Sequence, residues 1–163
     1  MLSLPEDEEI PETFNVKLIV SDGTNPIDGI GVKLNEVNKS TDSDGIVEYE
    51  VEEGNYIIEI TDERYDSYSE EINVSEDIET EITLNIKKYN LSVTVTDGEN
   101  PLGNVDVSIG EISGKTGNQG GCTLSQVPIG EHIITAKLTG YVDYSEEINV
   151  VEDGNVTIVM TVE

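Results

Sequence analysis

The chain has 163 residues, of which 35 are Asp or Glu and only 8 are Lys or Arg, so its formal charge at pH 7 is -27. A surface of this sign repels DNA, RNA and anionic lipid, and no cluster of Lys or Arg reverses it locally, which excludes nucleic-acid binding. The single cysteine excludes an intramolecular disulfide, and no run of about 18 consecutive apolar residues predicts a membrane span.

The first 13 residues form an acidic leader that contains five carboxylates and two prolines. The leader lacks the basic and apolar regions of a secretory signal, so we expect either a protein that acts where it is made or a piece of a longer secreted chain. Leu2, Leu4 and Ile10 alternate with polar residues in a segment that would be disordered alone. We expect these three side chains to anchor the chain to a larger assembly by strand addition.

The rest of the sequence is a tandem duplication of one unit. The stretch FNVKLIVSDGTNPIDGIGVKL from Phe14 matches YNLSVTVTDGENPLGNVDVSI from Tyr89, and SYSEEINVSED from Ser67 returns as DYSEEINVVED from Asp143. The offset is 75 residues at first and 76 from Gly54 onward, so one residue is inserted near SQVPIG in the second copy. We therefore expect two domains, 14–87 and 88–163, after the leader 1–13.

Each copy has the pattern of short, half-buried strands. Apolar residues alternate with polar ones, as in Phe14, Val16 and Leu18, and turn sequences such as SDGTNPIDG, TDSDG and EEGN interrupt them. The alternation predicts strands at 14–21, 30–36, 45–51, 55–62, 68–74 and 79–86, with counterparts in the second copy. The expected fold class is all-β, with two tandem antiparallel β-sandwiches joined by a short linker.

The second copy carries a recognisable order of motifs, namely VTDGENPLGNVDV, TGNQG, VPIGEHIITA and GYV. This order resembles the carboxypeptidase regulatory-like, or prealbumin-like, β-sandwich superfamily, and is similar to PEGA and collagen-adhesin B-type repeat modules. The resemblance covers both copies, although Arg64 stands in the first copy where Gly140 begins GYV in the second. It implies Ig-like sandwiches used as spacer, display or adhesion modules, and it implies no catalytic residue.

Asp42 and Asp44 in TDSDG are the candidates for a metal site. Two carboxylates before a glycine make half of a calcium loop, but the second copy has TGNQGG there, and no bidentate Glu follows at the end of the loop. We favour a tight turn in which the Asp side chains cap their own backbone.

Two tyrosine pairs are the candidates for a ligand or adhesion site. Tyr65 and Tyr68 recur as Tyr141 and Tyr144, flanked by acidic residues in each copy. Tyrosines beside carboxylates can stack on a sugar ring, whereas the competing interpretation, which we favour, is that the rings pack against the core.

Cys122 and His132 have no partners for chemistry in the sequence. Cys122 aligns with Val47, as a small buried hydrophobe would, and His132 aligns with Tyr56 and has no second His or paired Cys. Without a nucleophile–base pair or a cofactor loop, we expect a protein that is not an enzyme and binds no cofactor.

These observations favour a structural or display protein. The specific form that we expect is a virion-surface component, a capsid decoration or fibre protein anchored by its leader, because virion proteins reach the outside without an export signal. The alternative is an extracellular or cell-surface adhesin or spacer fragment that binds polysaccharide or protein. The expected partners are capsid or cell-surface proteins, and glycans for the adhesin, with no nucleic acid and no membrane insertion.

Overall fold

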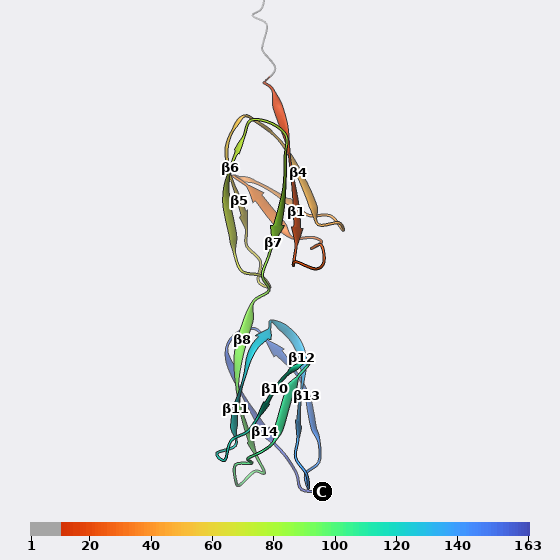
Figure 1. The fold of residues 1–163 in the computed structure, drawn as a ribbon, viewed down its shortest axis with the longest axis vertical. Coiled ribbons are helices and arrows are strands. Elements are labelled where there is room, and N and C mark those ends of the chain that lie inside the picture. Colours follow the sequence, from red (N-terminus) through yellow and green to blue (C-terminus); the bar gives the residue numbers. More distant parts are fainter. Residues whose placement is uncertain (1–10) are drawn as a thin grey trace, which may run out of the picture. The chain divides into compact units, whose positions relative to one another are not determined.

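The computed structural model describes residues 11–163, which divide into two compact units with the boundary between Asn85 and Ile86. Both units consist of strands and turns (Figure 1). The expected anchor residues Leu2, Leu4 and Ile10 lie outside the described residues. Within residues 11–163, no helix has the length and apolarity that a membrane crossing requires.

The first unit is a sandwich of two sheets, in which the strand orders are β4-β1-β7 and β3-β2-β5-β6. Its strands are β1 (Thr13–Ser21), β2 (Gly31–Leu34), β3 (Val37–Ser40), β4 (Ile46–Glu52), β5 (Gly54–Ile60), β6 (Tyr68–Val74) and β7 (Ile78–Thr83).

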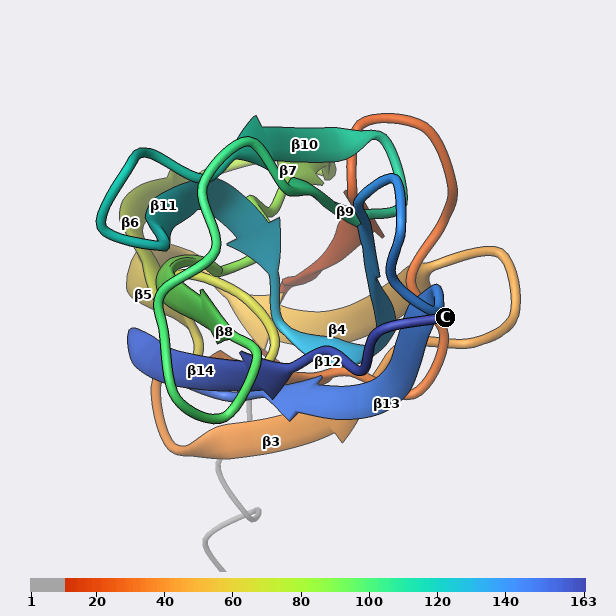
Figure 2. The ribbon, with the colours of Figure 1, turned by 90° about the horizontal axis from the view of Figure 1, so that it is seen from below.

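The second unit repeats this plan, with the strand orders β11-β8-β14 and β10-β9-β12-β13. Its strands are β8 (Lys88–Thr96), β9 (Asp106–Ile109), β10 (Ile112–Lys115), β11 (Gly121–Pro128), β12 (Gly130–Lys137), β13 (Tyr144–Val150) and β14 (Gly154–Val159). The strand β14 lies beside β8 (Figure 2). The all-β double sandwich predicted from the alternation is confirmed.

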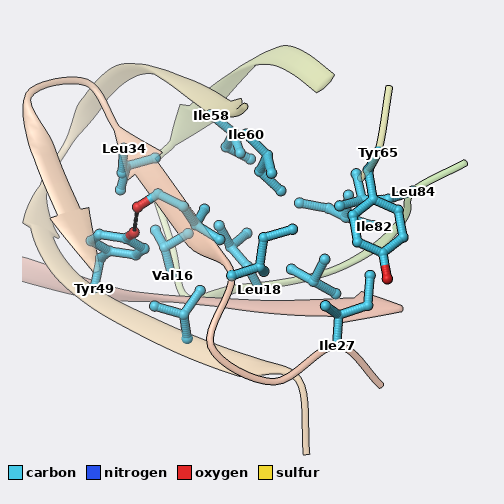
Figure 3. Close-up of a cluster of buried hydrophobic side chains, with 14 of the residues drawn as sticks. Val16, Leu18, Ile27, Leu34, Tyr49, Ile58, Ile60, Tyr65, Ile82 and Leu84 are labelled. Carbon is cyan, nitrogen blue, oxygen red and sulfur yellow. Dashed lines mark hydrogen bonds between the residues drawn. The ribbon is translucent and has the colours of Figure 1, made fainter. Parts of the chain in front are cut away.

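Alternation along the strands builds the two cores. In β1, Val16, Leu18 and Val20 are fully buried, while the residues between them face outward or are half-buried. Figure 3 shows Val16 and Leu18 packed with Leu34, Ile58 and other aliphatic side chains of the facing sheet. Burying a side chain of this size stabilises a fold by about 1.5–3 kcal/mol, so each row of apolar residues specifies the register of its strand.

One strand pair in each unit is parallel, which the antiparallel expectation did not include. The first strand β1 pairs in parallel with the last strand β7, and β8 pairs in parallel with β14. The other strand pairs of residues 11–163 are antiparallel. The parallel pairs arise because the chain crosses between the sheets and returns to the side of its first strand in the same direction.

Within the described residues 11–163, each unit has seven strands, one more than the alternation indicated. The expected strand 30–36 ends at Leu34, where Asn35 turns the chain with a φ of 51° into the edge strand β3. All four residues of β3 are exposed, so they show no alternation from which a strand could be recognised.

The residue inserted in the second copy forms a β-bulge. Leu124 pairs with Leu91 and Val127 pairs with Tyr89, so the register shifts by one residue between Leu124 and Val127. Gln126 adopts a φ of 61° in the bulge. Both Leu124 and Val127 stay fully buried, since the extra residue is absorbed between them and the alternation resumes.

Candidate functional site

Tyr65 and Tyr141 are held by the turns that precede β6 and β13. Tyr65 is only 9 % exposed and belongs to the first core, where its ring lies near Ile82 and Leu84 (Figure 3). Tyr141 is half-buried against the second core and forms an isolated β-bridge with Val162. The Tyr65 ring is therefore almost completely buried in its core, and the Tyr141 ring is only partly buried.

Tyr68 and Tyr144 begin β6 and β13, and both are half-buried against their cores. The Tyr68 hydroxyl donates a hydrogen bond to Glu70, and the Tyr144 hydroxyl donates one to Glu146. Burial and then the Glu70 carboxylate raise the pKa of Tyr68 to about 12. The pKa of Tyr144 is also raised, first by its hydrogen bond to Glu146 and then by burial.

The four candidate tyrosines thus contribute their rings to packing, and two of them have hydroxyls engaged by neighbouring carboxylates. Stacking on a sugar would have to use the half-buried rings of Tyr68, Tyr141 or Tyr144, because Tyr65 presents almost no surface. A ligand role for these residues stays a prediction.

The turn before Tyr65, where Arg64 stands in place of Gly140, differs from the one before Tyr141. Gly140 has a φ of 87°, whereas the first unit holds the turn with the Asp62 carboxylate. One oxygen of that carboxylate accepts hydrogen bonds from the backbone N–H of Arg64 at 2.8 Å and from its Nε at 3.0 Å. The guanidinium of Arg64 also lies 5.2 Å from the centre of the Tyr65 ring.

Asp42 uses its carboxylate to close a turn. Its Oδ1 accepts hydrogen bonds from the backbone N–H of Asp44 at 3.0 Å and of Ile46 at 2.9 Å. Among residues 11–163, no three His, Cys, Asp or Glu side chains are grouped so as to hold a metal ion. The geometry gives Asp42 a capping function, and metal binding at Asp42 and Asp44 stays untested.

His132 and Cys122 both have structural surroundings. The His132 Nε2 lies 2.7 Å from the Pro128 carbonyl oxygen, and its counterpart Tyr56 donates to the carbonyl of Glu52, also four residues earlier. The half-buried Cys122 packs against the second core, and burial raises the pKa of its thiol. A raised pKa disfavours the thiolate, which is the reactive form.

The buried polar side chains of the two units repeat one structural device. The Thr41 hydroxyl donates to the Ile27 carbonyl at 2.6 Å and accepts from the Ile30 N–H at 3.1 Å. Thr116 makes the equivalent bonds to Leu102 and Val105 at 2.7 and 2.9 Å. Each threonine ties the loop between the first two strands of its unit to the segment before the fourth.

Two surface hollows were missed by sequence reasoning, because each is assembled from residues far apart in the chain. A polar hollow of about 470 Å³ lies in the second unit beside Tyr141. The ion pairs Lys115–Asp106 at 2.6 Å and Lys137–Asp143 at 2.7 Å line it.

The second hollow, of about 520 Å³, lies in the first unit between the β2–β3 hairpin and β4. Its lining is more apolar and includes Leu34, Tyr49 and Val51. Both hollows bring together side chains of adjacent strand ends, which no single stretch of sequence displays.

Residues 100–163 match the PEGA domain family model. No curated protein sequence matches the chain. Among solved structures, the chain is similar to the Bacillus anthracis TIE protein, with 17 % identity and a TM-score of 0.67 over 93 % of this chain and 34 % of that one. The chain thus spans about a third of the length of that protein.

Two pilin structures align with lower scores. The shaft pilin SpaA from Lactobacillus rhamnosus GG has 10 % identity and a TM-score of 0.44, over 93 % of this chain and 98 % of that one. The minor pilin GBS52 of Streptococcus agalactiae has 14 % identity and a TM-score of 0.40, over 92 % and 96 % of the two chains. The match over residues 100–163, within the second unit, and the sandwich fold of both units fit the prealbumin-like β-sandwich repeat family that the motifs resemble.

Proposed function

We propose that the chain is a non-enzymatic structural and display segment, whose two sandwiches act as spacers in an assembly on an outer surface. The observation that carries this proposal is that the polar side chains conserved between the two copies stabilise loops and turns. Thr41 and Thr116 tie loops, and the Asp22 and Asp97 carboxylates cap equivalent turns. The grouped polar side chains at the two hollows, in contrast, differ between the copies.

The surface that carries the chain is either a virion, as a capsid decoration or fibre protein, or a cell envelope. The similarity to the TIE protein supports the sandwich fold and does not distinguish the two surfaces. Immunogold electron microscopy with an antibody against the folded chain, on intact cells and on purified particles from the same culture, tests the proposal. Label on particles establishes the virion form and label on cells the envelope form, while label confined to the cell interior contradicts display on either surface.

Anchoring through the acidic leader is part of this proposal. The leader joins the first unit at β1, whose first residue Thr13 is fixed by a hydrogen bond from its hydroxyl to Glu50 at 2.7 Å. Because that fixed strand starts at Thr13, deleting residues 1–10 should leave both units folded and abolish incorporation into the assembly. Equal incorporation of the deleted and full-length chains would show that the anchor lies elsewhere.

A second candidate function, adhesion to a polysaccharide, is favoured by the hollow of the second unit. A half-buried aromatic ring, Tyr141, stands there beside amide and charged groups of Asn104, Asp106 and Lys137, the combination that orients a sugar ring. Binding on a glycan array that is lost in Tyr141→Leu but kept in Tyr68→Leu would support it. The leucine keeps apolar packing while removing the stacking face, and Tyr68 is the matched tyrosine outside this hollow.

A further inference from the structure

The hollow of the first unit differs from the same place in the second unit by a lysine. Lys39 of β3 corresponds to Gly114 of β10 at the offset of 75 residues. A Cβ added to Gly114 would lie 3.2 Å from the Leu124 Cδ2 and 3.6 Å from the Cys122 Sγ. The glycine therefore lets the edge strand β10 lie directly against β11, and the second sandwich is closed at this edge.

Lys39 keeps the corresponding edge of the first sandwich open. Its Nζ donates a hydrogen bond to the Glu48 carbonyl at 2.7 Å and lies 5.0 Å from the centre of the Tyr49 ring. The lysine side chain thus occupies the space between β3 and β4 that is empty of side chain at Gly114. The consequence is visible at Val37, which is 53 % exposed, whereas its counterpart Ile112 packs against the second core.

The open edge combines two features that accept an extended peptide. The strand β3 is the edge of its sheet, pairs with β2 on its inner side, and has all four residues exposed. The hollow beside it has an apolar floor formed by Leu34, Val51 and the Tyr49 ring. A strand added to β3 could form main-chain hydrogen bonds with the edge and direct an alternate side chain into the hollow.

The charges at the rim select the partner. Glu36 and Glu50 stand at the hollow, and the whole chain carries a charge of -27. The exposed ammonium of Lys39 is engaged by the Glu48 carbonyl and the Tyr49 ring, and the two carboxylates at the rim outnumber it. A partner with acidic flanks would be repelled, and one with basic flanks attracted.

We propose that the β3 edge of the first unit binds an extended segment of another protein, in which an aliphatic side chain that enters the hollow is flanked by Lys or Arg. This inference deepens the proposed display function and rests on it for its biological meaning, since it names the surface through which the segment meets a basic partner. The binding itself is a property of the isolated chain.

The test measures binding of a synthetic peptide in which lysines alternate with leucine and valine, using NMR chemical shifts of the full-length chain. We expect saturable binding with a Kd on the order of 0.1 mM, shifts centred on Val37, Tyr49 and Tyr56, and weakening as salt is added. A peptide with glutamate in place of each lysine should not bind. Equal binding of the two peptides, or shifts centred elsewhere, overturns the proposal.

Two variants of the hollow test the proposal: one gives it residues of the second unit, and the other removes the exposed apolar side chain of Val37. The double variant Lys39→Gly with Tyr49→Leu is expected to raise the Kd for the basic peptide by about tenfold or more. The milder Val37→Ser is expected to raise it several-fold. Lys33→Gly on β2 is the matched control, because it removes the same charge from an exposed strand position outside this hollow. Binding that survives the double variant and Val37→Ser in folded protein, or that falls equally in Lys33→Gly, overturns the proposal.

The leader of the same chain is the competing occupant. If the peptide binds only after residues 1–10 are deleted, the hollow serves that segment and the proposal is wrong; equal binding with and without the leader supports it. Peptide binding and surface labelling are separate measurements, so a failure of this inference leaves the immunogold result standing, and the reverse also holds.

Discussion

The hydroxyl of Tyr49 donates a hydrogen bond to the carbonyl oxygen of Val32 at 2.6 Å, and this bond joins the two sheets of the first unit through the buried interior (Figure 3). Tyr49 lies on β4 and Val32 on β2, so a side chain of one sheet satisfies the backbone of the other. The second unit has Leu124, buried in its own core, at the position of Tyr49, and a leucine cannot form this bond.

Replacing Tyr49 by phenylalanine should destabilise the first unit by about 1–2 kcal/mol, because the bond is lost in a buried setting while the ring is retained. Urea unfolding, monitored through hydrogen exchange of the β2 and β4 amides, measures the change in the free energy of unfolding. Tyr56→Phe is the control, since its hydroxyl bonds to the Glu52 carbonyl in a more exposed position, and a loss below about 0.5 kcal/mol is expected. Equal losses in both variants would contradict the inter-sheet role of Tyr49.

Gly45 and Gly120 should tolerate no side chain. They have φ angles of 73° and 72°, and an added Cβ would lie 2.4 Å from the Val20 carbonyl oxygen and 2.5 Å from the Val95 carbonyl oxygen. We expect each alanine variant to lose more than about 2 kcal/mol in thermal or urea unfolding, from backbone strain and collision with backbone together.

Gly29→Ala separates these two causes. Gly29 has a φ of 69°, but nothing lies within 4 Å of an added Cβ, so only the backbone strain remains. A loss of about 1 kcal/mol is expected. If Gly29→Ala destabilises the chain as much as Gly45→Ala, contact with the Val20 carbonyl is not the cause.

Asp22 should make stability depend on pH in the acid range. Its Oδ1 accepts hydrogen bonds from the backbone N–H of Asn25 at 2.7 Å and of Thr24 at 2.8 Å, and these bonds lower its pKa below the ordinary value. A carboxyl with a lowered pKa in the folded state contributes stability above its unfolded pKa of about 3.9, and the contribution is lost as pH falls through the folded value.

The comparison of wild type with Asp22→Asn isolates this contribution from the general repulsion within the acidic chain. The wild type should be the more stable of the two at neutral pH, and the difference should disappear on acidification below the ordinary Asp pKa. Asp97 makes equivalent bonds and serves as the internal repeat of the experiment. A difference that grows on acidification would contradict the assigned sign.

Tyr68 and Tyr144 should respond differently to loss of their carboxylate partners. For Tyr68 burial is the larger cause of the pKa of about 12, so Glu70→Gln should lower the pKa only in part. For Tyr144 the hydrogen bond to Glu146 is the larger cause, so Glu146→Gln should remove most of the shift. Ring NMR signals across alkaline titration measure both, and the opposite order of effects would contradict the assigned causes.

The buried half of each strand could be predicted from the sequence, and the exposed edges could not. Alternation located β1, β4 and β6 to within one or two residues because one face of each strand packs on the core. The strand β3 shows no such pattern, since it pairs with β2 through its main chain and all four of its residues are exposed. The parallel pairing of β1 with β7 was missed for a related reason, because the order of strands in a sheet leaves no local trace.

The two surface hollows could not be predicted from the sequence either. The tyrosine pairs were candidates for a ligand site because they recur in both copies. Their rings, however, pack in or against the cores, most completely at Tyr65. The replacement of Lys39 by Gly114 is a difference between the copies, and it acts through packing between β10 and β11, which only the structure shows. Listing the positions at which the two copies differ would have identified the β3 edge as a candidate site.

The parallel pairing of the first and last strands has a mechanical consequence. The N-terminal end of β1 and the C-terminal end of β7 point in opposite directions along one ladder that runs from Val16–Ile78 to Ser21–Thr83. A tensile force applied through the two ends of the unit would shear the rungs of this ladder together, instead of peeling them apart one at a time. Since β8 and β14 repeat the arrangement, the same shear geometry holds in the second unit.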